Sequence, residues 1–105
     1  MSNPRFIPRN YAQIPSQFGK SKIISWLTPD SRMQKERLAS SQLQHKFAFR
    51  IWSRLQFLGR PVSEYAEAIG VSYDRTAKVL RGATIMRLED IAVAEIELGG
   101  ILSSP

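Results

Sequence analysis

The clearest hydrophobic pattern in the chain begins after Arg60. Apolar positions there are spaced one and three residues apart, which places them on one face of a short helix over residues 63–69. Gly70 and Ser72 follow, and glycine suits the left-handed conformation that ends a helix, while a serine hydroxyl accepts the free N–H groups that open the next one. The predicted buried face consists of Tyr65, Ala66 and Ile69.

A second short helix is predicted over residues 73–81, with Gly82 ending it. Its apolar stripe is thin and its polar face is broad, which is typical of a helix whose outer face serves a partner rather than its own core. Two such helices joined by a tight turn form the helix-turn-helix motif, whose second helix lies in the DNA major groove. The predicted inner positions are Thr76, Ala77, Val79 and Leu80, and the outer ones are Tyr73, Asp74, Arg75, Lys78 and Arg81.

A long helix is predicted over residues 28–58, which contain no glycine and whose only proline is Pro29. Thr28 provides an N-cap, Pro29 suits the first helical position, and Asp30 lies near the positive end of the helix dipole. About 30 residues is long for a small domain, so we expect a break near residues 39–42. Apolar residues recur near the helical period at Met33, Leu38, Leu43, Phe47, Ile51, Leu55 and Leu58.

The last predicted helix, over residues 87–98, carries two apolar stripes, so it needs two covering surfaces. One stripe, formed by Leu88, Ile91, Ala92, Glu95 and Leu98, is assigned to the core. The other is covered either by the N-terminal extension or by a second copy of the chain. The candidates for a dimer interface are Met86, Val93, Ile96, Ile101 and Leu102.

The first 28 residues are predicted to form an extension rather than part of the domain at 29–105. Its prolines are too closely spaced for a helix, so we expect an extended arm that is either disordered, docked on the domain, or bound to nucleic acid. Residues 19–27 fit a short amphipathic helix or a single strand. With the other elements, the sequence predicts an all-α bundle of four to five helices.

The chain has 105 residues and a formal net charge of +6, and this surplus is unevenly placed. Residues 1–46 hold eight basic and two acidic side chains, whereas residues 47–105 hold seven of each. Basic side chains at phosphates release counterions and add affinity for a polyanion. The same surplus also fits a protein that merely needs solubility.

Several functional classes have no support in the sequence. Cysteine is absent, which excludes disulfides and thiolate metal sites, and the one histidine, His45, is expected to be solvated or capping rather than a ligand or a base. No apolar run approaches a membrane span, and the N-terminus lacks the apolar segment of a signal peptide. We therefore expect a cytoplasmic protein that is not an enzyme and uses no metal, cofactor or small-molecule ligand.

Residues 58–99 resemble the Cro/C1-type helix-turn-helix family of phage repressors and xenobiotic-response-type bacterial regulators. The resemblance rests on Gly59, Tyr65-Ala66, Gly70-Val71-Ser72, Gly82 and Leu98-Gly99. It implies a lambda-repressor-like fold. The chain departs from the family pattern at Thr76, where the family has an Ile or Val, at Leu80, where it often has Glu, and at Arg54-Leu55, which are shifted by one position.

The resemblance also implies which residues contact DNA. Lys78 can donate to guanine, Asp74 can accept from cytosine, and Tyr73 can pack on a thymine methyl group. The candidates for base contacts are Ser72, Tyr73, Asp74, Arg75 and Lys78. The candidates for phosphate contacts are Arg81, Thr84 and Arg87 after the second helix, with Arg5, Arg9, Lys20 and Lys22 in the extension.

The function expected from these features is that of a sequence-specific regulator that binds double-stranded DNA as a homodimer and represses transcription. Two alternatives stay open. One is an antitoxin-like or adaptor protein whose basic extension or last helix binds another protein. The other is a phage or plasmid accessory factor that binds DNA during recombination or segregation.

Overall fold

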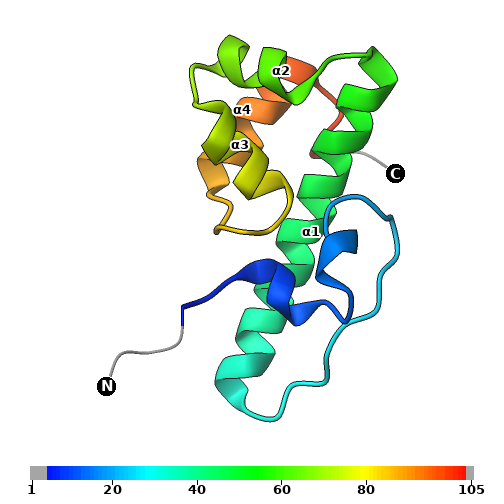
Figure 1. Ribbon diagram of the computed structural model, residues 1–105, viewed down its shortest axis with the longest axis vertical. Coiled ribbons are helices and arrows are strands. Elements are labelled where there is room, and N and C mark those ends of the chain that lie inside the picture. The colour runs from blue at the N-terminus through cyan, green and yellow to red at the C-terminus, as the bar shows by residue number, and fades with distance from the viewer. Residues whose placement is uncertain (1–4, 104–105) are drawn as a thin grey trace.

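The computed structural model describes residues 5–103, and in this range the fold is all-α, as predicted. Residues 1–4 of the predicted extension and 104–105 of the predicted domain lie outside the described part. Figure 1 shows helix α1 as a central spine, with α2, α3 and α4 gathered beside its C-terminal half and the N-terminal segment wrapped around its N-terminal half. The elements are η1 (Pro8–Tyr11), η2 (Pro15–Gln17), α1 (Arg32–Leu58), α2 (Val62–Ile69), α3 (Tyr73–Leu80) and α4 (Leu88–Leu98).

Helix α1 differs from its prediction in two respects. It begins at Arg32 rather than near Thr28, because the Ser31 hydroxyl caps it by accepting the Gln34 N–H at 3.1 Å. It also runs unbroken through residues 39–42, so the predicted break is wrong. Ser41 in that stretch is fully buried against the rest of the fold, and Ala39 and Gln42 beside it are good helix formers, so the helix continues through these residues.

The turn between α2 and α3 forms as the sequence predicts. Gly70 has φ 73°, and the Val71 N–H bonds the Ala66 carbonyl at 3.0 Å, which closes the end of α2. The Ser72 hydroxyl then accepts the Arg75 N–H at 3.2 Å and opens α3. The two short helices are thus held at a fixed angle by local hydrogen bonds.

The hydrophobic core draws on every α-helix and on the N-terminal segment. Helix α3 turns Thr76, Val79 and Leu80 inward, and α4 contributes Ala94 and Leu98. Burial of each valine or leucine side chain among them stabilises the fold by about 1.5–3 kcal/mol. The buried cluster comprises Phe18, Ala48, Ile51, Leu55, Tyr65, Val79, Leu80, Met86, Ala94, Leu98 and Ile101.

The described part of the N-terminal segment is docked on the helices, so the alternative of a disordered arm is wrong for these residues, while contact with nucleic acid stays a prediction. The Phe18 side chain is 1% exposed, and the Arg9 N–H bonds the Gly82 carbonyl at 3.0 Å, at the end of α3. Residues 19–27 form neither of the two elements that the sequence allowed, a short helix or a strand. They are irregular, apart from an isolated antiparallel bridge between Trp26 and Ala12. The segment therefore belongs to the same packed unit as the helices.

His45 is buried, so the expectation of a solvated residue is wrong. Its Nδ1 accepts the Gly19 N–H at 2.9 Å, and its Nε2 lies 3.3 Å from the Lys22 carbonyl oxygen. The Phe18 ring packs edge-on against it at a centroid distance of 5.4 Å. Because Nδ1 accepts, the neutral ring carries its proton on Nε2 and connects the N-terminal segment to α1.

Acid should weaken this connection. Burial lowers the pKa of His45 from its ordinary value of 6.5, against the opposing effect of the backbone carbonyls of Lys22 and Ser21. As the pH falls below 6.5, the unfolded chain therefore takes up the proton first, and the free energy of unfolding should fall by at most about 1.4 kcal/mol per pH unit. Above that pH the residue should contribute no pH dependence.

Urea unfolding at a series of pH values checks this prediction. The His45→Gln variant serves as the control, because the chain has one histidine and its removal should abolish the slope just below neutral pH. An equal slope in the variant and the wild type would contradict the assignment.

Within residues 5–103, no helix combines the length and the apolar character needed to cross a membrane.

Candidate nucleic-acid interface

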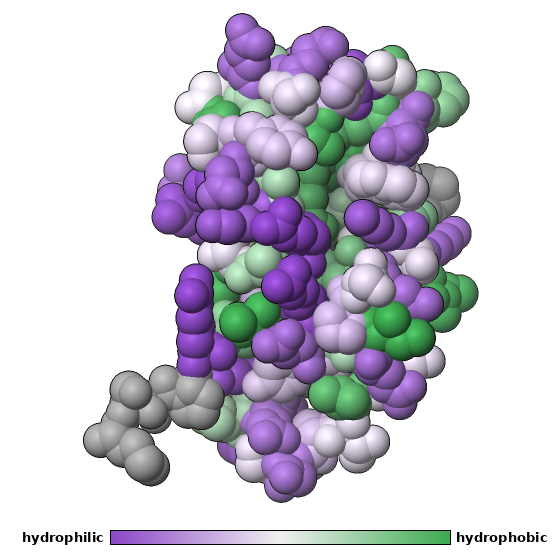
Figure 2. Space-filling model, in the orientation of Figure 1, coloured by the Kyte–Doolittle hydropathy of each residue, from purple (hydrophilic) through white to green (hydrophobic). Residues whose placement is uncertain are grey.

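The outer face of α3 is a continuous polar surface. Tyr73 is 59% exposed, and Asp74, Lys78 and Arg81 are also exposed, while Thr76, Val79 and Leu80 are buried on the opposite side. Helical periodicity causes this division, since positions 74, 78 and 81 share one face. Figure 2 shows hydrophilic side chains gathered over the side of the molecule where Figure 1 places α3.

Asp74 and Lys78 form an ion pair across one turn of this face. The Lys78 Nζ lies 2.9 Å from the Asp74 Oδ2, and both side chains remain largely exposed. Exposed pairs at this spacing contribute only about 0.3–0.5 kcal/mol, so either group can exchange its partner for a ligand at little cost. The pair presents a donor and an acceptor side by side.

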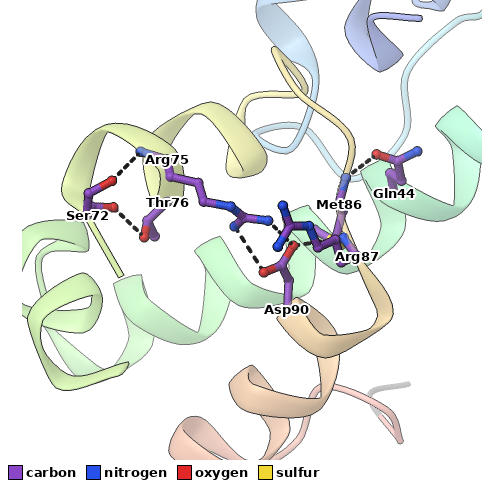
Figure 3. Close-up of polar contacts among 7 residues, drawn as sticks. All are labelled: Gln44, Ser72, Arg75, Thr76, Met86, Arg87 and Asp90. Carbon is purple, nitrogen blue, oxygen red and sulfur yellow. Dashed lines mark hydrogen bonds and ion pairs between the residues drawn. The ribbon is translucent and has the colours of Figure 1, made fainter. Parts of the chain in front are cut away.

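Arg75 does not belong to the outer face, which corrects its assignment as a base contact. Its Nη1 and Nη2 donate to the two carboxylate oxygens of Asp90 at 3.0 and 3.1 Å (Figure 3). A bidentate pair of this kind fixes both side chains. Arg75 therefore connects α3 to the start of α4, and its guanidinium is engaged within the fold.

Asp90, which pairs with Arg75, also caps α4. It was not among the predicted site residues. Its Oδ2 accepts the Arg87 N–H at 2.8 Å and thereby caps α4. Arg87 is not a typical N-cap residue, so the spacing from Arg87 to Asp90 carries no clear helix-start signal in the sequence, and the contact with Arg75 depends on how α3 and α4 pack. One carboxylate thus sets the position of α4 relative to α3.

Ser72 and Thr76 fix the first turn of α3. Besides the Ser72 cap, the Thr76 Oγ1 donates to the Ser72 carbonyl at 2.9 Å. This bond satisfies the hydroxyl of Thr76, which is buried where the family has an aliphatic residue. Ser72 is exposed at the N-terminus of α3, although its hydroxyl already serves the helix.

The loop between α3 and α4 is held by α1. The Gln44 Oε1 accepts the Met86 N–H at 2.8 Å, and the Gln44 amide group in turn donates to the Ser40 hydroxyl at 3.0 Å (Figure 3 shows the first bond). Gln44 could not be predicted as a positioning residue, because a single glutamine on a helix carries no signal of a long-range contact.

The predicted phosphate contacts fall into two groups. Arg9 and Lys20 lie near Arg81, because the Arg9 N–H bonds the Gly82 carbonyl and Gly19 lies against the Leu80 carbonyl. Thr84 is half-buried in the following loop and Arg87 is exposed at the start of α4. By contrast, Arg5 lines a hollow at the N-terminal end of α1, and Lys22 lines a groove beside Lys46 on α1.

Two of the five dimer-interface candidates are wrong. Met86 and Ile101 are buried in the core of their own chain, so neither can contact a second copy. Ile96 is 85% exposed, Leu102 is also exposed, and Val93 is half-buried. Leu88, assigned to the core, is instead 84% exposed, which places an apolar stripe of Leu88, Ala92 and Ile96 on the outer face of α4.

Over residues 5–103 no three His, Cys, Asp or Glu residues are grouped in a way that could hold a metal ion. No family model matches the chain, and no significant match was found among curated proteins or solved structures. The resemblance to the Cro/C1-type family thus rests on the motif residues themselves.

Proposed function

We propose that the protein is a sequence-specific regulator that binds double-stranded DNA through a lambda-repressor-like helix-turn-helix and represses transcription by occupying its site. The observation that carries this proposal is the exposed polar face of α3 at the second position of a two-helix motif. An α-helix with its side chains is about 10–12 Å across, which fits a major groove about 12 Å wide.

Three side chains on that face have the chemistry to read base edges. Lys78 can donate to guanine O6 or N7, Asp74 can accept from cytosine N4, and Tyr73 can pack on a thymine methyl group. Each contact discriminates between bases by about 1–3 kcal/mol. The weak Asp74–Lys78 pair supports this use, because DNA would replace an exposed contact that contributes little.

Basic side chains at the C-terminal end of α3 would hold the duplex in register. Arg81 directly follows α3 as its C-cap, while Arg9 and Lys20 come from the docked N-terminal segment. Thr84 and Arg87 follow in the loop and at the start of α4. Each phosphate that such a group neutralises releases counterions and makes binding salt-dependent.

Replacing Lys78 with alanine should weaken binding to the preferred site by about tenfold or more and relax the preference at one base pair. Footprinting and titration on the same duplex measure both effects. The matched control is Lys35→Ala, which removes an exposed lysine from the far end of α1. Equal binding by the Lys78 variant and the wild type would exclude α3 as the reading helix, and the absence of any footprint would favour an adaptor role.

We further propose that the protein binds as a homodimer through the outer stripe of α4. Ile96→Glu would place a carboxylate in that stripe on both copies, so it should convert the dimer to monomer and reduce affinity for a two-fold symmetric site. Sedimentation velocity reports the change. Ile23→Glu is the control, because Ile23 is equally exposed but lies in the N-terminal segment. A wild type that sediments as a monomer, or an Ile96 variant that stays dimeric, would contradict the proposed interface.

A further inference from the structure

A basic groove runs along the side of α1 that faces away from α3. It has a volume of about 590 Å³, and none of the described residues that line it is acidic. Its basic and aromatic lining residues, which define the basic groove, are Lys22, Lys46, Phe49, Arg50, Arg54 and Phe57.

Helical geometry sets the direction of this groove. On α1 the groove is centred on Lys46, Phe49 and Phe57. Their spacings of three and eight residues place them on one face of the helix. The α1 residues in the core, Ile51 and Leu55, lie about 150° around the helix from that stripe. A molecule in the basic groove would therefore leave the outer face of α3 uncovered.

The arginines of the groove are held in place but retain free donors. The Arg50 Nη1 donates to the Ile101 carbonyl at 2.9 Å, and the Arg54 Nε donates to the Leu98 carbonyl at 3.3 Å. Each guanidinium has five N–H donors, so these bonds leave most of them for a ligand. Prior fixation lowers the entropy that binding would cost.

The groove also offers apolar surface. Phe57 is 79% exposed, and the Arg54 guanidinium covers one face of its ring at 5.4 Å from the centroid. Phe49 lies tilted between His45 and Trp52, with ring centroids 6.4 and 6.2 Å away. The rings thus provide a hydrophobic wall rather than a row of open faces on which successive bases could stack.

We propose that the basic groove binds an acidic amphipathic segment of another protein. A duplex is too wide for a concave site of this volume, which lies in the range that encloses a small ligand or part of a peptide. Lys46 and Arg50 are one helical turn apart, which matches carboxylates four residues apart on a helical peptide. Their charge would select the segment, and Phe57 would hold its apolar side chains. The proposal does not depend on DNA binding by α3.

A synthetic helical peptide tests this assignment, with glutamates four residues apart and leucines between them, labelled for fluorescence anisotropy. We expect Lys46→Glu to weaken binding by about tenfold and Phe57→Ala by several-fold. The matched controls are Lys35→Glu and Met33→Ala, which make the same kinds of change at exposed positions near the other end of α1 and should leave binding unchanged. A peptide with glutamine in place of glutamate should not bind.

Three results would overturn the proposal. The first is no binding of the acidic peptide to the wild type. The second is an equal loss in Lys46→Glu and Lys35→Glu, which would indicate general charge attraction. The third is displacement of the peptide by oligothymidylate together with tighter binding of that oligonucleotide, which would assign the groove to single-stranded nucleic acid. Circular dichroism of each variant separates loss of binding from loss of fold.

Discussion

Gly82→Ala should lower the free energy of unfolding by about 3 kcal/mol, because two costs meet at this position. Gly82 has φ 74°, a conformation that costs an L-residue about 1–2 kcal/mol. A methyl group there would also lie 2.7–2.9 Å from three atoms of the Phe18 ring. That ring is fully buried, so the strain cannot be relieved without moving the N-terminal segment. Chemical denaturation measures the loss.

Gly70→Ala is the matched control. Gly70 has nearly the same φ, 73°, and also ends a helix, but a methyl group there would meet nothing within 4 Å. Its cost should therefore be limited to about 1–2 kcal/mol. Equal losses in the two variants would mean that Phe18 does not pack against Gly82, and would contradict the docking of the N-terminal segment.

Asp90→Ala should cost about 2–3 kcal/mol, the second-largest effect expected. The substitution removes the cap of α4, which contributes about 1 kcal/mol, and leaves the half-buried Arg75 guanidinium without its carboxylate. Glu89→Ala is the control, since it removes the adjacent exposed acid of the same helical turn and should change stability by less than about 0.5 kcal/mol.

A double-mutant cycle separates the two roles of Asp90. Arg75→Ala retains the cap and should cost less than Asp90→Ala, and the double variant should cost less than the sum of the two single losses. Strict additivity would show that the Arg75–Asp90 pair does not contribute to stability. Arg75 would then again be a candidate for the DNA surface.

The parts of the fold that could be predicted are those encoded by neighbouring residues. The α2–α3 turn follows from Gly70 and Ser72, and the inward face of α3 follows from the spacing of Thr76, Val79 and Leu80, because caps and periodicity act within a few residues. The start of α1 was wrong by a few residues, since Thr28 and Ser31 both resemble an N-cap and only the packed chain decides between them.

The contacts that sequence reasoning missed join residues far apart in the chain. Nothing near Phe18 indicates that its ring covers Gly82, and nothing near His45 indicates that the Gly19 N–H reaches it. The candidate site was affected in the same way. The spacing of α3 predicts that Lys78 is exposed, which is confirmed. The pairing of Arg75 could not be predicted, because its partner Asp90 lies on another helix. Tertiary packing decides such cases.

The measurement that tests the central proposal most directly is selection from a pool of random duplexes, performed in parallel with the wild type and a variant in which Tyr73, Asp74 and Lys78 are all alanine. These three exposed side chains do not support the core, so the variant should fold normally. We predict that the wild type enriches a short two-fold symmetric sequence and that the variant enriches none. Enrichment of the same sequence by both proteins, or by neither, would contradict the proposal that α3 reads DNA.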